Sequence, residues 1–490
     1  MAILANIKQR MLRIKLHMKQ FYILTSSFLL VLSSNICAFG QSEKEITNIS
    51  MHGNCLLLKN EKLSDDLDKV MFLATNNLVA KASKEELLSS KYDLKAAQRF
   101  FIPSLTISGT YGPNWSKNYN STNYGYTYTY TEDYNSNYYM SNIDIIATWN
   151  LLDLSQISLI NSLAYTVDAQ KRDLTKTKQE LAQESAQTFL KIQKIYNTYL
   201  AYKDLELLYY ENIATTNDLI AMGLRSKIDL MNSERQLLEY QSSIQEKMIS
   251  LEDNKSELSK LLNTPLCTNI FNAENEILKS ENKKFIVKNA ISISPTIQGL
   301  ELQEKSLKMR ALSHKRNYIP TIYIEGYVNG NYLDKLGEKP YYNDYDTTSS
   351  TLFLGFNWSV FDGGINKANY KSTMALAESI NNKKKQSILD LKFVINKLRQ
   401  TQPMLVDKNN ILKESLEKQQ KITEAIKTNY ILNFSNYYDF QSAAQTLLEA
   451  KLEYIESNYG INSNTLDYEN NFLFPSFPLT HKTLKISDSS

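Results

Sequence analysis

Residues 154–222 read LSQISLINSLAYTVDAQKRDLTKTKQELAQESAQTFLKIQKIYNTYLAYKDLELLYYENIATTNDLIAM, without a proline or a glycine. A single helix over this stretch would be ~100 Å long at ~1.5 Å per residue, several times the ~30 Å core of a bilayer. Its apolar side chains recur in steps of three and four, as in a helix that packs in coiled-coil fashion (Phe189, Ile192, Tyr196, Tyr199). The polar residues between them rule out a membrane-spanning helix. The stretch therefore predicts one helix of a long helical rod.

A glycine ends this stretch and predicts a turn. Gly223 can adopt the left-handed backbone conformation that closes many helix ends. A return helix is expected from about Ile228 to Leu262, because Asn263 and Pro265 follow it. The two helices predict a helical hairpin with its turn at Gly223.

The residues before the long helix predict one helix and two strands. The helix is expected from Ser64 to about Phe101, after which a proline stops it. Apolar and polar residues alternate over Ser104–Tyr111 and again over Asn142–Leu151, as in strands with one apolar face. The tyrosine-rich residues 112–141 have the low complexity of disordered segments. Their alternation favours an extended hairpin loop instead.

The same order of elements occurs twice. Residues 99–107 (RFFIPSLTI) return as residues 316–324 (RNYIPTIYI), and residues 148–153 (TWNLLD) return as residues 357–362 (NWSVFD). The residues that follow the first turn, from Asp229 to Glu239, likewise return as Asp439 to Glu449. We interpret this similarity as an internal duplication in which only the loops differ in length.

The second copy predicts the same elements with two differences. Strands are expected over Ile322–Val328 and Leu352–Val360, followed by a long helix over about Ile365–Leu432. Pro403 lies inside this helix and is expected to kink it. Asn433 stands where the first copy has its turn glycine, and asparagine tolerates the left-handed conformation.

The N-terminus has the features of a secretory signal peptide. Basic residues precede the apolar run Phe21–Leu32, and small residues at Ala38 and Gly40 form a cleavage pattern. A membrane anchor is a weaker alternative because the run is shorter than the ~20 residues that a span needs, and Cys37 allows a lipoprotein. The predicted segments are a signal peptide (1–40), the first repeat (41–270), the second repeat (271–462) and a C-terminal tail (463–490).

Composition excludes several function classes. Removal of residues 1–40 lowers the formal net charge from +3 to −2, so no basic surplus suggests nucleic acid. The four histidines are scattered without metal-ligand spacing, and no phosphate-binding motif occurs. We therefore predict no enzyme, metal site or cofactor, and we interpret residues 361–364 (FDGG) as the turn where a strand becomes a helix. Cys55 and Cys267 are free to form a disulfide in an exported protein, but nothing requires it.

The four strands predict a membrane barrel that one chain cannot close. Each strand has an apolar and a polar face and about the length of a tilted membrane strand. Four strands are fewer than the roughly eight of the smallest barrels, and an open edge cannot face lipid. The chain must therefore oligomerise, as a dimer with eight strands or a trimer with twelve. The helices are expected in the periplasm because the strands are joined through the long loops. A soluble sandwich is the alternative.

The repeated pattern of helix, proline, strand, strand, Asp and helix resembles the TolC-type outer-membrane efflux proteins from about Leu63 to Gly460. Residues 360–364 (VFDGG) resemble the most characteristic motif of that family. The resemblance implies a homotrimer with a twelve-stranded barrel and a periplasmic α-barrel of long helices. It also implies an equatorial belt of irregular segments, which here would be residues 41–62, 265–295 and 461–490 and would contain both mature cysteines. Such a protein is the outer-membrane exit duct of a tripartite efflux or type I secretion system in a Gram-negative bacterium. Its partners are a periplasmic adaptor, an inner-membrane transporter and outer-membrane lipid.

The resemblance also implies which residues close the channel entrance. Counted from the two turns, Asp229, Tyr430 and Asp439 match the family's gate positions, and a Tyr430–Asp229 hydrogen bond between neighbouring hairpins is expected. Two positions depart from the family pattern: Ser435 replaces a basic residue, and Ser442 replaces an acidic one. The alternative is that both aspartates only begin helices, where the helix dipole favours acids.

The turns themselves are expected to bind the adaptor. The residues concerned are Met222, Gly223 and Leu224 of the first turn and Asn433, Phe434 and Ser435 of the second. Packing within each turn explains Leu224 and Phe434 equally well.

A non-conducting coiled-coil surface or scaffolding protein remains the alternative function. Solubility of the mature protein without detergent would favour it, whereas the alternating strands argue against it. Drugs, metals, peptides and proteins all stay open as cargo.

Overall fold

The computed structural model describes residues 63–124, 128–266, 277–278, 287–335 and 347–473. The predicted signal peptide, Cys37, Cys55 and Cys267 lie outside these ranges. The described elements belong to one compact unit. None of the helices in these ranges is both long enough and apolar enough to cross a bilayer.

The N-terminal helical region contains two helices where the sequence predicted one. Helix α2 (Leu63–Ala74) and helix α3 (Leu78–Gln98) are separated by a turn, and a 3-10 turn η2 (Arg99–Phe101) follows. Asn77 causes the break: its side chain accepts a hydrogen bond from the Ala80 amide at 2.9 Å and so caps α3. Polar side chains of this kind offer the backbone a competing partner, which is why the single-helix prediction was wrong here.

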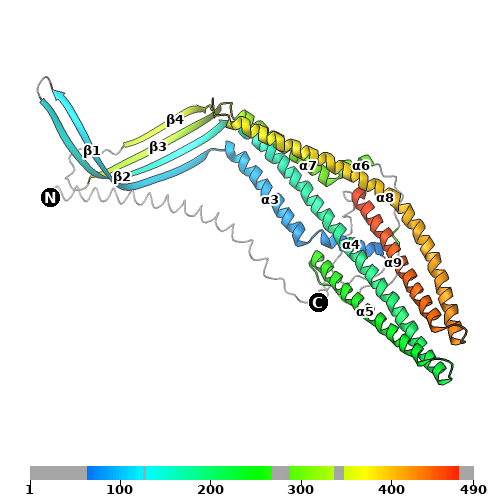
Figure 1. Cartoon of the computed structure of the whole chain (residues 1–490). Helices are drawn as coiled ribbons and strands as arrows, with labels where there is room; N and C mark the ends of the chain where they lie inside the picture. Colours follow the sequence, from blue (N-terminus) through cyan, green and yellow to red (C-terminus); the bar gives the residue numbers. More distant parts are fainter. Residues whose placement is uncertain (1–62, 125–127, 267–276, 279–286, 336–346, 474–490) are drawn as a thin grey trace, which may run out of the picture. The chain divides into compact units, whose positions relative to one another are not determined.

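Four antiparallel strands form one sheet in chain order (Figure 1). They are β1 (Ser104–Tyr124), β2 (Tyr128–Leu152), β3 (Thr321–Lys335) and β4 (Thr347–Asn357). Strands β1 and β2 stay paired as far as Tyr124 and Tyr128, which confirms the extended hairpin. Strands β1 and β4 are the sheet edges within the described chain.

One face of the sheet is apolar from edge to edge. The register places Leu105 opposite Ala147, Ile145 opposite Val328, and Ile324 opposite Leu354, so the apolar residues of all four strands share a face. Much of this face is exposed in the single chain (Leu105, Ile107, Ile143, Ile145, Trp149, Val328, Leu352, Leu354, Phe356). The other face carries a polar cluster in which Tyr327 donates to Asp144 at 2.6 Å and Asn329 donates to Asn142 at 2.6 Å.

The corners where helices become strands are built alike in the two copies. The indole N–H of Trp149 donates to the carbonyl of Phe101 at 3.0 Å, and that of Trp358 donates to the carbonyl of Tyr318 at 2.9 Å. In the second copy this bond replaces the end of the predicted strand, because β4 ends at Asn357 and not at Val360. The chain then turns through Gly363 and Gly364, both at positive φ, so the strand-to-helix turn is confirmed.

The long helices follow the predicted bounds closely. Helix α4 (Leu154–Ala221) begins at the Asp153 cap, and α5 (Lys227–Leu262) returns beside it. Helix α8 (Ile365–Ile431) runs uninterrupted through Pro403 and curves along its length in Figure 1, and α9 (Tyr437–Leu473) packs against it. The predicted left-handed turn residues are confirmed, with φ of 74° at Gly223 and 63° at Asn433.

Two further helices complete the second copy. Helix α6 (Val287–Ile293) precedes α7 (Pro295–Arg316), the counterpart of α3. The expectation of irregular structure was wrong for α6 and for residues 461–473, which belong to α9. Helix α4 is central, since it contacts α2, α3, α5, α7 and α9, while α8 contacts α7 and α9.

Two apolar cores hold the helices together. The middle core joins α2, α4 and α5 around Val70, Phe189 and Leu258. The tip core lies near the turns and contains aromatic residues from all four long helices (Tyr209, Tyr240, Tyr430, Tyr437, Phe440).

Candidate functional site

The two hairpin turns share one backbone conformation. At the first, the amides of Leu224 and Gly223 donate to the carbonyls of Leu219 and Ile220, at 2.8 and 2.9 Å. At the second, the amides of Phe434 and Asn433 donate to the carbonyls of Asn429 and Tyr430, at 2.8 and 3.1 Å. Both patterns are the Schellman closure of a helix, which needs a left-handed residue at the position of Gly223 and Asn433.

The helices that leave the turns are capped differently. The hydroxyl of Ser226 accepts from the Ile228 amide at 3.0 Å at the start of α5. At the start of α9 the cap is reciprocal: Asn436 accepts from the Asp439 amide at 2.9 Å, and Asp439 accepts from the Asn436 amide at 3.0 Å. Asp439 is thus an exposed capping residue, as the alternative interpretation expected. A role at a channel entrance stays a prediction for it.

Tyr430 is buried between the two hairpins. Its relative exposure is 0%, and its hydroxyl lies 3.0 Å from the Thr216 hydroxyl of α4. Burial raises the pKa of Tyr430, and the nearby charge of Asp229 acts in the same direction. Within the chain the Tyr430 hydroxyl pairs with Thr216 and not with Asp229, so the expected Tyr430–Asp229 hydrogen bond is not formed between the chain's own two hairpins. Asp229 lies half-buried in the first turn of α5.

Arg225 connects the two turns and was missed by the sequence analysis. Its guanidinium carbon lies 4.3 Å from the centre of the Tyr430 ring. Its Nη2 donates to the carbonyls of Tyr430 and Ser435, at 3.1 and 2.5 Å. The first of these carbonyls is in the last turn of α8, where the helix dipole favours a cation. The signal was present in the sequence, since a basic residue expected two positions after the second turn stands two positions after the first.

A buried polar network lies beside these contacts. The Ser233 hydroxyl donates to Asn212 at 3.1 Å, and Thr216 lies between Asn212 and Tyr430. Aromatic rings pack around it, with centroids 5.6 Å apart for Tyr209 and Phe440 and for Tyr430 and Phe440. Burial also raises the pKa values of the other tyrosine hydroxyls of the tip core (Tyr209, Tyr240, Tyr437).

Ion pairs join the hairpins farther from the turns. Lys427 of α8 pairs with Glu211 of α4 at 2.5 Å, and Lys451 of α9 pairs with Asp204 of α4 at 2.7 Å. The two hairpins of one chain therefore meet through charges, a tyrosine hydroxyl and an arginine, in addition to the aromatic core.

The outer surface of the turns is apolar. Phe434 is 81% exposed, and Met222 and Leu224 are exposed on the first turn. Ser435 is half-buried and donates to the Ile426 carbonyl at 3.3 Å. The structure adds exposed apolar side chains that the sequence analysis did not select (Ile228, Met231, Leu432, Tyr438).

Comparison with solved structures identifies the fold. CusC superposes with a TM-score of 0.69 at 13% identity, covering 86% of this chain and 95% of that one. The CmeC outer-membrane channel of Campylobacter jejuni gives 0.67 at 14%, covering 87% and 90%. The chain has the TolC-type fold. The open state of the MtrE outer-membrane channel of Neisseria gonorrhoeae also superposes, with a TM-score of 0.68 at 12% identity, covering 83% and 88%.

The likeness lies in the fold and in the repeated order of elements rather than in overall sequence identity. No model of a protein family matches the sequence, and a search of the curated proteins found no match. At identities of 12–14% the fold is shared while individual side chains are not transferable. The roles of the turn residues therefore have to be argued from their contacts.

Proposed function

We propose that this chain is one protomer of a cyclic outer-membrane channel that passively conducts substrates out of the cell. The observation that carries the proposal is the sheet: one continuous apolar face is exposed, and both edge strands lack partners within the described chain. Water disfavours such a face, and lipid disfavours such edges. Closure with further copies of the chain in a membrane satisfies both requirements.

The outer helices of the chain lie on the same two sides as the unpaired edge strands of the sheet. Strand β1 follows α3, and β4 leads into α8. In the half next to the sheet the helices contact one another in the order α3, α4, α7, α8, so α3 and α8 are the outer helices. A head-to-tail ring joins the β4 and α8 side of one copy to the β1 and α3 side of the next.

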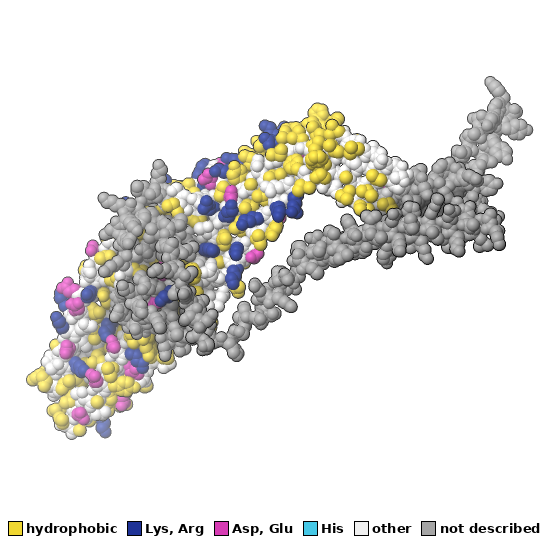
Figure 2. Space-filling view, turned by 180° about the vertical axis from the view of Figure 1, so that it is seen from behind, with side chains coloured by type: hydrophobic (Ala, Val, Ile, Leu, Met, Phe, Trp, Pro, Cys, Tyr) yellow, Lys and Arg dark blue, Asp and Glu magenta, His cyan; other side chains and the backbone are white. Residues whose placement is uncertain are grey.

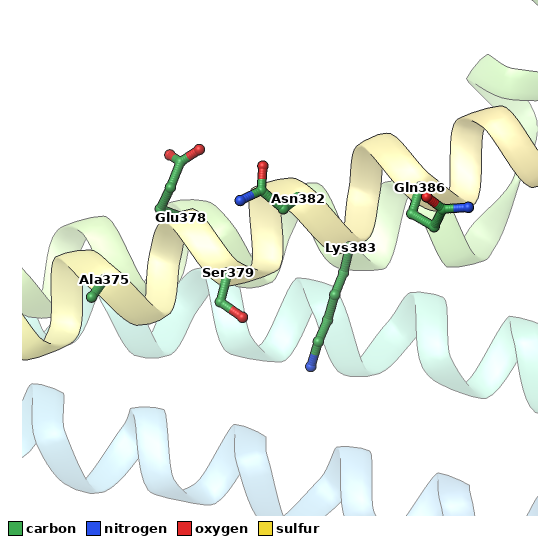
Figure 3. Close-up of a pocket in the computed structure, with 6 residues that line it drawn as sticks. All are labelled: Ala375, Glu378, Ser379, Asn382, Lys383 and Gln386. Atoms are coloured by element: carbon green, nitrogen blue, oxygen red, sulfur yellow. The ribbon is translucent and has the colours of Figure 1, made fainter.

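Helix α8 supports this ring because one of its faces is not covered by other helices of the same chain. Large apolar side chains along it are exposed, among them Leu376, Phe393, Met404 and Ile411. The open surface pocket in Figure 3 is lined by side chains of α8 alone (Ala375, Glu378, Ser379, Asn382, Lys383, Gln386). A helix of the next protomer is the occupant that this face requires.

The TolC-type fold supports three copies, which give a twelve-stranded barrel above a periplasmic ring of long helices. The helices lie in the periplasm of a Gram-negative cell, and the turns point away from the outer membrane. The exposed apolar turn residues (Met222, Leu224, Phe434) then dock a periplasmic adaptor, with Gly223, Asn433 and Ser435 shaping the turns. An inner-membrane transporter supplies energy and cargo in a tripartite efflux or type I secretion system.

The gate of this channel is assigned to the contacts between the turns. Arg225 holds the second turn against the first, and Tyr430 packs below it against Thr216. Opening requires the hairpins to separate, which exposes these groups to water. Asp229 and Asp439 add negative charge at the same level of the entrance.

Planar-bilayer conductance of the purified mature protein tests both parts. Wild type should give small, mostly closed currents, and larger currents are expected for Arg225→Gln and for Tyr430→Phe combined with Asp229→Ala. Arg235→Gln is the matched control, because Arg235 is exposed and forms an ion pair with Glu239 of its own helix. No conductance from folded protein would favour the scaffolding alternative, while large currents in every variant would keep the channel and refute the gate.

A further inference from the structure

Charged side chains are unevenly distributed along the helices. The segments that join strands to helices (91–103, 153–164, 309–320, 361–372) contain eight Lys or Arg and three Asp. The adjacent segments farther from the sheet (78–90, 165–176, 297–308, 373–384) contain nine basic and seven acidic residues. Positive charge is therefore in excess next to the sheet, although the mature chain as a whole is slightly acidic.

Seven of the eight cations next to the sheet are exposed. Arg316 is the exception, because it is half-buried and donates to Ser158 at 2.8 Å. We define the other seven as the basic collar (Lys91, Lys95, Arg99, Arg310, Lys315, Lys367, Lys371). Within the described chain none of them forms an ion pair.

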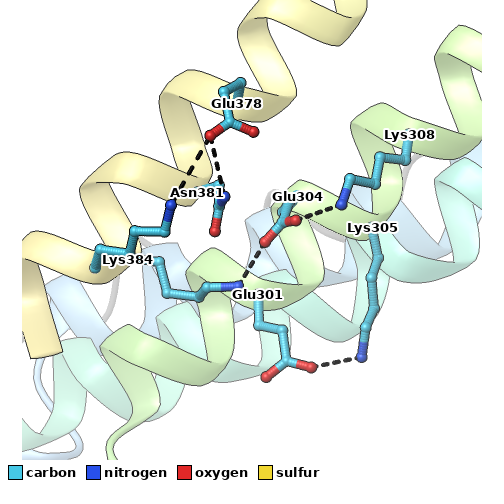
Figure 4. Close-up of polar contacts among 8 residues, drawn as sticks. Glu301, Glu304, Lys305, Lys308, Glu378, Asn381 and Lys384 are labelled. Carbon is cyan, nitrogen blue, oxygen red and sulfur yellow. Dashed lines mark hydrogen bonds and ion pairs between the residues drawn. The ribbon is translucent and has the colours of Figure 1, made fainter.

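Of the nine cations in the adjacent segments, five form ion pairs (Lys171, Lys176, Lys305, Lys308, Lys384). Figure 4 shows Glu304 of α7 between Lys308 of α7 and Lys384 of α8, at 2.6 Å from each. Lys305 pairs with Glu301 in the same way at 2.6 Å. The collar cations thus have their side chains available for an external anion, whereas these lysines are paired with carboxylates of the same chain.

The helix dipole accounts for only part of the collar. Lys95 and Lys315 lie in the last turns of α3 and α7, where a dipole favours cations. Lys367 and Lys371 lie in the first two turns of α8, where the dipole disfavours them. An external anion beside Lys367 and Lys371 would therefore stabilise this end of α8.

The collar adjoins the apolar face of the sheet. Trp149 and Trp358 are exposed at the corners between helices and strands, directly beside the collar segments. Figure 2 shows Lys and Arg side chains gathered on the helices next to a dense hydrophobic band. Apolar strands, then tryptophan, then basic residues is the order met on passing from the hydrocarbon core of a membrane to its headgroups.

We propose that the basic collar binds the phosphate headgroups of anionic phospholipids in the leaflet nearest the helices. The inference rests on the proposed membrane location of the sheet and adds a lipid class to it. In the single chain each cation of the collar is exposed, and charges at the level of the headgroups attract acidic lipids additively. The collar fixes the depth of the channel as well as the composition of its lipid shell.

Lipid retention by the full mature chain tests this proposal. The protein is reconstituted in equal parts of phosphatidylethanolamine and phosphatidylglycerol, extracted with its surrounding lipid in polymer-bounded discs, and the lipid ratio in the discs is measured. Wild type should be enriched in phosphatidylglycerol. A variant with five collar residues changed to Gln (Lys91, Lys95, Arg99, Lys367, Lys371) should lose that enrichment by about tenfold at low salt.

Matched variants separate charge from position and from misfolding. Gln at Lys392, Lys397, Lys408, Lys413 and Lys421 removes the same charge from exposed sites of α8 farther from the sheet, and wild-type enrichment is expected. Arg at Lys91, Lys95, Lys367 and Lys371 keeps the charge and should keep the enrichment. Equal loss in the collar and control variants, or no enrichment of wild type, would overturn the collar. Failure of wild type to insert into any bilayer would instead overturn the proposed function.

Discussion

The two hairpin turns have the same backbone conformation, but their side chains differ in the contact between them. Residues 223–230 and 433–440 close their helices with the same hydrogen bonds around a left-handed residue. The first turn carries the cation Arg225, and the second receives it through the Tyr430 ring and two carbonyl oxygens. The two copies thus share the backbone geometry of the turn, which both hairpins need. They differ in their part in the contact between the turns: the first supplies the cation and the second supplies the ring and the carbonyl oxygens that bind it.

The largest effect is expected where the copies differ most in burial. Tyr430→Ala removes a fully buried ring from the tip core and should lower the free energy of unfolding by about 3–5 kcal/mol. Its counterpart in the first copy, Ile220, is half-buried, so Ile220→Ala should cost about half as much. Guanidinium denaturation of both variants makes the comparison. Equal losses would mean that the two turns are equivalent after all.

Arg225 is the next most sensitive position. Arg225→Ala removes the ring contact and both charge-assisted hydrogen bonds, with an expected loss of about 2 kcal/mol in thermal or denaturant unfolding. Arg225→Lys should recover only part of it, because an ammonium group cannot both cover the ring and bridge two carbonyls. A transposed pair, Arg225→Ser with Ser435→Arg, examines whether the cation works from either turn. Full stability of Arg225→Ala would show that the bridge is incidental.

The turn residues should differ by a smaller amount. Gly223→Ala places a side chain at a φ of 74°, with open space around the new Cβ, so only backbone strain of about 1 kcal/mol is expected. Asn433→Gly should be nearly neutral because both residues tolerate this conformation. Melting temperatures of the two single variants provide the measurement. A larger loss for Asn433→Gly would mean that its side chain, and not its φ, matters.

The smallest effect concerns the helices α3 and α7, where buried Leu87 of the first copy corresponds to Glu304 of the second. Hydrogen bonds from Lys308 and then Lys384 lower the pKa of Glu304. This carboxylate therefore stabilises the fold above its unfolded pKa of about 4.3, and the contribution is lost as pH falls through the folded value.

Glu304→Leu, which makes the second copy like the first, tests this difference. The variant should change stability by less than about 1 kcal/mol at pH 7, since a packed apolar residue replaces a costly buried charge. Wild type should lose stability relative to the variant in melting curves recorded at decreasing pH below 5, because only wild type has this carboxylate to protonate. A constant difference across that range would exclude the titration of Glu304 as its cause.

Features that depend on local pattern were predictable from the sequence. The long helices, the turn residues Gly223 and Asn433, and the extended tyrosine-rich hairpin follow from periodicity, helix-end chemistry and the internal repeat. The break at Asn77 was not predicted, because a capping asparagine competes with a helical pattern that is otherwise continuous.

Contacts between elements distant in sequence were not predictable. The bond from Tyr430 to Thr216 depends on how α8 packs on α4, and periodicity does not fix that alignment. Arg225 reaches the second turn across 205 residues of sequence to Tyr430, and no local pattern marks its target. The structure was needed to show that Arg225 of the first turn binds the second turn.

The tryptophan corners have a mechanical consequence. In each copy the bond ties the end of the second strand to the residues just before the first strand, so a tilt of the attached helices would pivot about this joint. A helix of ~100 Å acts as a lever about that pivot, and a tilt of about 3° displaces its far end by about 5 Å. A small force at the turns then suffices to tilt the helices, because α4 and α8 are long.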